Sequence, residues 1–349
     1  MKIQHLMRSY GFIVAVLLGS LALADPLPAQ SSKSFFSGKT ITLIVGSSAG
    51  GGTDNAARLI ARHIGKHIPG NPRIVVSNMA GAGGMRAANH LYNRVDPDGL
   101  TWSTMNTGAL FGKATGNTAL KFDLEKFIFL GQAYDEAQAV YVRSATPYTS
   151  FEAIRKANKE GKKPKMGAQA KAHSSNVVVK IIEQIMDAEF DVVYGYPGTP
   201  EILLDIERGA LDGRSHGTGS LLSTKRDWID GKFIKILVTS KSTRDERLPD
   251  VPSISELAPA GNKSFLSALF ASQYIGRSLV MPPKVPADRV KVLRDAFAAT
   301  VKDAEFLKDA EKLGFEIGLI RGEEMNRDIE ETMNDQKLMG LYKKILTAP

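Results

Sequence analysis

The sequence predicts an α/β protein of two lobes, each lobe a mainly parallel β-sheet flanked by helices. Short apolar runs alternate with segments of helical periodicity in two separate clusters, and a mostly helical tail follows them. Continuous apolar strands that alternate with helices are typical of parallel sheets covered on both faces. The length of 349 residues corresponds to about two domains, and 43% apolar with 23% charged residues is an ordinary globular composition.

The first cluster occupies residues 39–137 and begins with a compact apolar run. Ala56, Leu59 and Ile60 then recur near helical spacing until Pro69 interrupts the pattern, which predicts a helix that ends there. The expected order in this cluster is strand 41–45, helix 53–68, strand 74–76, helix 85–92 and strand 101–105.

The second cluster occupies residues 138–239 and repeats the alternation. Strands are expected at 138–142, 165–168, 190–194 and 234–238, and helices at 150–159, 174–186 and 200–208. A polar, proline-containing connection at 244–252 leads to helices expected at 287–300, 304–313 and 322–346. We expect this tail to pack on the first cluster, so that lobe 1 comprises residues 39–137 and 240–349 and lobe 2 residues 138–239.

Residues 1–24 have the features of a secretory signal peptide. Lys2 and Arg8 form a short basic region, an uncharged apolar run follows, and small residues at the end of the run place the expected cleavage near Ala24. The run is too short to span a bilayer comfortably. We therefore expect a periplasmic protein whose residues 25–38, rich in Pro, Ser and Gly, are flexible.

Composition excludes several classes of function. The absence of cysteine excludes disulfides, thiolate zinc sites, iron–sulfur clusters and a cysteine nucleophile. Cleavage after Ala24 lowers the formal charge from +8 to +6. The remaining cations are scattered, and an exported protein does not meet the chromosome, so we expect no nucleic-acid partner. His63 and His67 have the spacing of a metal pair on a helix, but no nearby carboxylate completes a site, so we expect no metal.

A glycine-rich turn joins the first expected strand to the first helix. Its residues 46–54 read GSSAGGGTD. Glycine lets the backbone approach a ligand closely, and the helix start beyond it presents free N–H groups and a partial positive charge, which together suit an anion. Thr53 or Asp54 could instead simply cap the helix. Turns at 81–84 and 106–108 end the next two strands, and ligands bind beyond the carboxyl ends of strands in open α/β sheets, so we expect all three turns on one rim.

The second cluster contains two comparable strand-to-helix loops, at residues 167–175 and 194–199. Both offer backbone N–H groups and polar side chains. Tyr194 and Tyr196 either stack on a ligand or pack within the fold, and the sequence favours neither alternative.

The turn has a rival interpretation as a catalytic motif. Residues 46–50 match Gly-x-Ser-x-Gly, the nucleophile turn of serine hydrolases. In that alternative the protein is a secreted hydrolase with Ser48 as nucleophile and His173 or His216 as base. An α/β-hydrolase needs an earlier strand and loop for its oxyanion hole, however, and the mature segment before the turn is too short to hold them. The turn also lacks the Lys of a nucleotide-binding P-loop.

Taken together, these segments resemble the extracytoplasmic solute receptors of tripartite tricarboxylate transporters, the Bug family of periplasmic binding proteins. The matching stretches follow the same order along nearly the whole mature chain, at residues 44–57, 75–87, 97–100, 193–212, 247–253 and 282–299. The resemblance implies a two-lobed fold like that of type II periplasmic binding proteins, with the ligand cleft between the lobes. It also implies binding of a small organic acid through backbone N–H groups and ordered waters rather than through arginine.

The same resemblance implies which residues bind the ligand. Carried over by position, they are Ser47, Ser48, Gly50, Gly51, Gly52, Asp54, Thr107, Gln169, His173, Ser174, Tyr196 and Gly198. No catalytic residue and no cofactor is expected. Residues 46–49, 169–171 and 195–198 depart from the usual family pattern, and these departures leave the identity of the ligand open.

The resemblance also implies how the receptor works. A monomer would close its lobes as a hinge around the acid and deliver it to the membrane permease subunits of a tripartite transporter. A receptor that signals through a membrane sensor, independent of any transporter, is an alternative that the sequence does not separate from transport.

Overall fold

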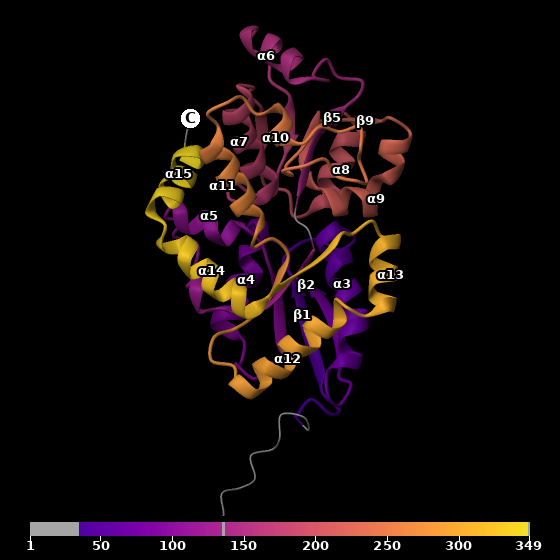
Figure 1. Cartoon of the computed structure of the whole chain (residues 1–349), viewed down its shortest axis with the longest axis vertical. Helices are drawn as coiled ribbons and strands as arrows, with labels where there is room; N and C mark the ends of the chain where they lie inside the picture. The colour runs from indigo at the N-terminus through magenta and orange to yellow at the C-terminus, as the bar shows by residue number, and fades with distance from the viewer. Residues whose placement is uncertain (1–34, 135–136, 348–349) are drawn as a thin grey trace, which may run out of the picture.

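The computed structural model describes residues 35–134 and 137–347, so the predicted signal peptide and most of the segment expected to be flexible lie outside it. Two β-sheets form the centres of two lobes that are stacked along the long axis of the molecule (Figure 1). We call the six-stranded sheet with its helices lobe 1, and the five-stranded sheet with its helices lobe 2. Residues 35–38 form a turn that buries Phe36 in lobe 1.

Lobe 1 is built from two separate parts of the chain. The first part contains β1 (Thr40–Val45), α3 (Gly52–Ile64), η1 (Gly65–His67), β2 (Arg73–Asn78), η2 (Ala82–Gly84), α4 (Met85–Arg94), β3 (Thr101–Met105), α5 (Gly108–Ala114), η3 (Leu124–Lys126) and β4 (Ile128–Tyr134). The second part contains β10 (Ser278–Met281), α12 (Ala287–Thr300), α13 (Ala304–Lys312), β11 (Ile317–Arg321), α14 (Gly322–Asn334) and α15 (Gln336–Thr347). The strand order is β11-β4-β10-β3-β1-β2.

Lobe 2 is continuous in sequence through its sheet. Its elements are β5 (Gln138–Arg143), α6 (Phe151–Lys159), β6 (Lys165–Gly167), α7 (Ser174–Met186), β7 (Asp191–Val193), α8 (Thr199–Glu207), β8 (Gly213–Gly217), α9 (Thr218–Asp230) and β9 (Ile234–Thr239). The strand order is β7-β6-β8-β5-β9.

Both sheets contain parallel and antiparallel pairs. β1 runs parallel to β2 and β3, and β6 runs parallel to β7 and β8, as expected for strands joined by helices. β10 and β11 run antiparallel to their neighbours in lobe 1, and β5 does so in lobe 2, which the sequence did not predict. β5 and β10 each follow a passage of the chain between the lobes, so no crossover helix within one sheet fixes them as parallel.

The segment that follows β9 does not go straight back to lobe 1. Ser253 forms a parallel bridge with Thr239 at the end of β9, next to the short helix α10 (Ile254–Leu257). Helix α11 (Lys263–Gln273) then packs against α7 of lobe 2. This contact places a helix from the segment expected in lobe 1 against lobe 2. The lobe boundaries expected from the sequence stay a prediction.

The apolar cores hold the sheets and helices in register. In lobe 1, Leu43, Trp102 and Phe297 are fully buried between the sheet and the helices α3 and α12. A second cluster extends across both lobes, where Phe111 of α5 stacks edge-on against Tyr342 of α15 at 4.9 Å between ring centroids. Within the described part of the chain, none of the helices combines the length and the apolarity that crossing a membrane requires.

Candidate functional site

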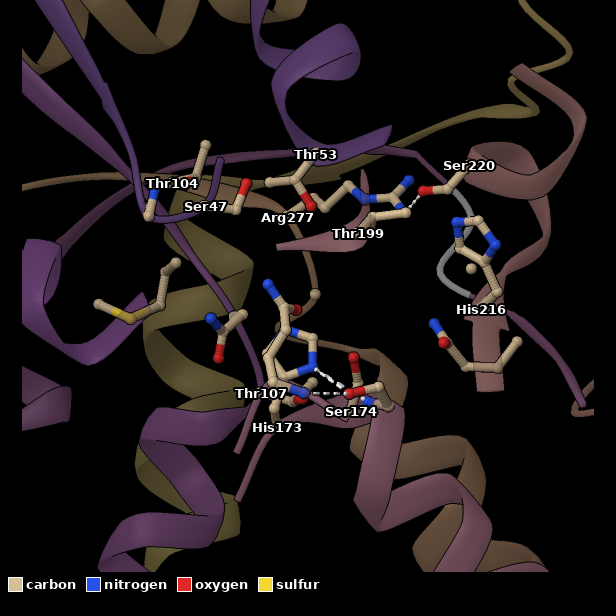
Figure 2. Close-up of a pocket in the computed structure, with 18 of the residues that line it drawn as sticks. Ser47, Thr53, Thr104, Thr107, His173, Ser174, Thr199, His216, Ser220 and Arg277 are labelled. Carbon is tan, nitrogen blue, oxygen red and sulfur yellow. Dashed lines mark hydrogen bonds between the residues drawn. The ribbon is translucent and has the colours of Figure 1, made fainter. Parts of the chain in front are cut away.

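A small cavity lies where the two lobes meet, at the carboxyl ends of β1 and β3 and beside the N-terminus of α7 (Figure 2). Its volume is about 50 Å³. The residues of its wall on the side of lobe 1 are Gly46, Ser47, Thr53, Thr104, Met105, Asn106 and Thr107, together with Gly276 and Arg277 directly before β10. Lobe 2 contributes Gln138, Gln169, His173, Ser174, Ser175, Thr199, Arg214, His216, Gly217 and Ser220.

On the side of lobe 1, hydroxyl groups line the cavity at the ends of neighbouring strands. Ser47 follows β1, and Thr107 follows β3. Both side chains are buried, and within the described residues neither hydroxyl oxygen has a hydrogen-bond partner. A buried hydroxyl without a partner is unfavourable, so these two groups are suited to a polar ligand.

The buried carboxylate of Asp54 stabilises the glycine-rich turn through hydrogen bonds. It accepts hydrogen bonds from the backbone N–H of Gly50 at 2.9 Å, from Nε of Arg58 at 2.8 Å and from Nδ2 of Asn78 at 2.9 Å. Burial alone would raise the pKa of Asp54, but these hydrogen bonds outweigh it and hold the pKa below its usual value. Asn78 also donates to the carbonyl of Ser47 at 3.0 Å, so the whole turn is fixed through one carboxylate.

On the side of lobe 2, His173 caps helix α7. Its Nδ1 accepts the backbone N–H of Ser175 at 3.1 Å, which assigns the ring proton to Nε2. Loss of solvent around the ring, together with the guanidinium groups of Arg214 and Arg277, lowers the pKa of His173 to about 3. The ring is therefore neutral at pH 7 and serves as a fixed dipole in the wall.

Buried arginines form the remaining part of the wall. Arg214 lies on β8 and is 2% exposed, and Arg277 precedes β10 and is 9% exposed. Arg277 reaches across from lobe 1 and donates through Nη2 to the hydroxyl of Ser220 on α9 (Figure 2). The resemblance implies ligand binding through backbone N–H groups and ordered waters rather than through arginine; that stays a prediction, and the structure adds that two guanidinium groups line the cavity. They come from positions far from the glycine-rich turn, the segment on which that expectation was based.

Glycine permits the close approach of the two lobes beside the cavity. A Cβ atom on Gly52, at the start of α3, would lie 2.0 Å from Oγ of Ser220 on α9. A Cβ atom on Gly198, before α8, would lie 2.7 Å from Cβ of Ser48. Real Cβ atoms do not approach so closely, so side chains at these two positions would push the lobes apart.

The structure divides the residues predicted to bind the ligand into three groups. Ser47, Thr107, Gln169, His173 and Ser174 line the cavity together. Ser48, Gly51, Gly52 and Gly198 lie at the contact between the lobes instead. Gly50, Asp54 and Tyr196 do not line the cavity: Gly50 and Asp54 bond to each other in the turn, and the Tyr196 hydroxyl donates to Asp205 at 2.7 Å within lobe 2.

Sequence reasoning missed Arg214, Ser220 and Arg277, and it considered His216 only as the base of the hydrolase alternative. The sequence did contain one signal for Arg214 and His216, the segment Gly-Arg-Ser-His-Gly. In the structure this segment is the short strand β8, and all of its residues are buried. Lys, Glu, Arg and Asp are almost never fully buried without a partner, so an arginine in a central strand points to a polar site.

The hydrolase alternative finds no base in this geometry. His173 is bonded to Ser175, and Nδ1 of His216 lies 3.4 Å from the hydroxyl of Tyr141. Across residues 35–134 and 137–347, no histidine is hydrogen-bonded to Ser48, which the motif would make the nucleophile. The Gly-x-Ser-x-Gly match therefore lacks the partner that would activate its serine.

The histidines of α3 and η1 do meet carboxylates, contrary to expectation. Nε2 of His63 lies 3.2 Å from Asp309, and Nε2 of His67 lies 3.3 Å from Asp303. Both carboxylates belong to the α13 region, far along the chain, so local spacing did not reveal them. The Nζ atom of Lys66, 2.9 Å from Asp303, already provides a cation for this cluster.

Comparison with known proteins identifies the family. The family model described as the tripartite tricarboxylate transporter family receptor matches residues 56–343. The chain belongs to this family. A curated relative from Agrobacterium vitis, the UPF0065 protein in the TAR-I ttuE-ttuC' intergenic region, is 26% identical over 86% of this chain and 82% of its own length. Another UPF0065 protein, from Bordetella bronchiseptica, is 26% identical over 71% of this chain and 72% of its own length.

Solved structures of other receptors share this fold. The periplasmic binding protein BugD superposes with a TM-score of 0.74 at 19% identity, covering 88% of this chain and 98% of that one. MatC from Rhodopseudomonas palustris with bound malate superposes with a TM-score of 0.71 at 19% identity, covering 88% and 99%. An R. palustris protein with adipate gives 0.71 at 20% identity, covering 88% and 97%. These likenesses show that the two-lobed architecture is that of periplasmic binding proteins.

Proposed function

We propose that this protein is an exported solute receptor that captures a small organic acid by closing its lobes and delivers it to a tripartite membrane transporter. One observation carries the proposal: a cavity between the lobes is lined by polar groups from both of them. A ligand that satisfies both walls stabilises the closed arrangement, because it binds that arrangement better than the open one.

The chemistry of the wall favours an anion. Buried hydroxyls at Ser47 and Thr107 have no hydrogen-bond partner among the described residues, and each has a donor to offer a carboxylate oxygen. The ring of His173 is uncharged at pH 7, so it neither attracts nor repels an anion by net charge. Arg214 and Arg277 contribute positive charge, which strengthens attraction to an anion in a site that excludes water.

The size of the cavity favours a small ligand. Drug-sized ligands occupy pockets of about 300–1,000 Å³, whereas this cavity measures about 50 Å³. We infer a short-chain carboxylic acid rather than a long or bulky one. The presence of malate and adipate in two structurally similar receptors supports the class of ligand.

Delivery to a membrane partner is inferred from the family. Receptors of this family are named for tripartite tricarboxylate transporters, and structural neighbours are periplasmic. We infer that the signal peptide directs the chain to the periplasm and that the closed, loaded form is the one that docks on the permease.

A calorimetric and thermal-shift panel tests the proposal. The panel contains malate, succinate, adipate, citrate, glutamate and benzoate, with the methyl ester or amide of each acid as a neutral control. We expect at least one short acid to bind and to raise the melting temperature, while its neutral analogue does neither. A panel in which no acid binds would contradict the proposed class of ligand.

A further inference from the structure

Arg214 stands out among the groups around the cavity because nothing described in the protein balances its charge. It is the second residue of β8, the central strand of the lobe 2 sheet, and is 2% exposed. Its Nε donates to the neighbouring carbonyl of Ser215 at 2.9 Å. Over residues 35–134 and 137–347, no carboxylate lies within ion-pair distance of Arg214, and its Nη1 is buried without a hydrogen-bond partner.

A buried cation in this state is expensive for the protein. Removing a charged group from water is strongly unfavourable unless an opposite charge and hydrogen bonds compensate it. Arg214 faces a cavity, so the compensating anion has a place to bind. The guanidinium also presents N–H donors in a planar fork that matches the two oxygens of a carboxylate.

His216 provides a second donor on the same face of the strand. Residues two positions apart in a strand point to the same side, which places the side chains of Arg214 and His216 together. Nδ1 of His216 lies 3.4 Å from the Tyr141 hydroxyl; in the tautomer in which that hydroxyl donates to Nδ1, the ring proton is on Nε2. That Nε2 atom is buried and has no hydrogen-bond partner among the described residues.

We propose that Arg214, assisted by Nε2 of His216, binds a carboxylate of the ligand and is the residue that makes this receptor select acids over neutral analogues. The inference rests on the proposed function and deepens it. With the lobes apart, water solvates the guanidinium; when they close, only a negatively charged ligand replaces that water adequately. Lobe closure is thereby coupled to the charge of the ligand, and a neutral molecule of the same shape leaves the cation uncompensated.

Paired variants separate this role from a structural one. Arg214→Met removes the charge and nearly keeps the volume, Arg214→Lys keeps the charge without the fork, and Arg226→Met removes an exposed cation from α9 of the same lobe as the control. Each is titrated by calorimetry with the tightest acid of the panel and its neutral amide, and each is melted without ligand.

We expect Arg214→Met to bind the acid at least about 30-fold more weakly and to lose most of the preference for acid over amide. Arg214→Lys should fall between Arg214→Met and the wild type, and Arg226→Met should stay within about twofold of the wild type. Without ligand, Arg214→Met should melt at the wild-type temperature or above it, because in the absence of the acid Arg214 makes no ion pair that stabilises the fold.

Two results would overturn the inference while the proposed function stands. One is acid binding by Arg214→Met within about threefold of the wild type. The other is a clear loss of melting temperature in both unliganded Arg214 variants, which would assign the arginine a structural role. A wild-type protein that binds no acid in the panel would instead overturn the proposed function together with this inference.

Discussion

The contact between Gly52 and Ser220 allows a direct test of lobe closure. Gly52 begins α3 in lobe 1, and Ser220 lies on α9 in lobe 2. A Cβ atom on Gly52 would lie 2.0 Å from Oγ, 2.2 Å from Cβ and 2.7 Å from Cα of Ser220. Because the backbone Cα is itself too close, no rotation of the Ser220 side chain relieves the clash, and the lobes must separate.

The substitution Gly52→Ala should therefore weaken ligand binding without damaging the fold. Forcing an extra methyl group into a packed contact costs about 1–3 kcal/mol, which corresponds to a loss of affinity of about 5- to 150-fold. In the open arrangement the same methyl group has space, and alanine favours a helix over glycine by up to about 1 kcal/mol. We thus expect weaker binding by calorimetry together with an unchanged or higher melting temperature of the unliganded protein.

Gly340→Ala provides the matched control. Gly340 lies within α15, and a Cβ atom there would have no neighbour within 4 Å. This variant makes the same chemical change in a helix away from the lobe contact, so its affinity should equal that of the wild type. If Gly52→Ala binds the acid as tightly as Gly340→Ala does, the contact is not required for binding and the reasoning about closure is refuted.

Two further predictions concern pH and the glycine-rich turn. The pKa of His173 is lowered from 6.5 to about 3 in the folded protein. Between these two values the unfolded chain binds a proton at this ring and the native state does not. The free energy of unfolding should therefore fall as the pH falls from about 6.5 to about 3. Chemical denaturation of His173→Asn, which keeps a good helix cap, should show a weaker pH dependence there; identical curves for both proteins would contradict the assignment. Asp54→Asn replaces one of the two carboxylate oxygens that accept from three donors by an amide nitrogen and removes the negative charge, so we expect a loss of about 1–3 kcal/mol in the free energy of unfolding and weaker acid binding. Asp295→Asn, on the exposed face of α12, should leave both unchanged, and an equal effect of the two variants would show that Asp54 does not shape the turn.

Local patterns were sufficient for the elements that are held together by short-range interactions. The apolar run before Gly46, the helix from Ser174 to Met186 and the helix from Ala287 to Thr300 were all predicted within a residue or two of their observed bounds. Periodicity and turn residues determine such elements because their hydrogen bonds form within a few residues. The long tail helix expected at 322–346 is instead two helices, because the chain leaves the helix at Asp335.

Strands without helical crossovers were harder to predict. β10 lies before the helices expected in the tail and β11 lies between two of them; neither strand was predicted, and each pairs antiparallel with β4, from much earlier in the chain. Their stability comes from partners that no sequence window contains. The same applies to α9, whose glycine and serine near its start look unsuited to a helix but lie against lobe 1.

The sequence by itself therefore determined the two-lobed α/β architecture, the family and the glycine-rich turn, since the elements and the turn follow from local patterns and the family follows from the order of short stretches along the chain. Only the tertiary structure decided which side chains meet in the cavity. Asp54, which was expected to bind the ligand, forms hydrogen bonds within the glycine-rich turn instead and does not line the cavity. Arg214 and Arg277 both line the cavity, although they lie far apart in the sequence. The physical reason is that a cavity between lobes is assembled by non-local strand pairing and helix packing, which bring together residues that share no local pattern.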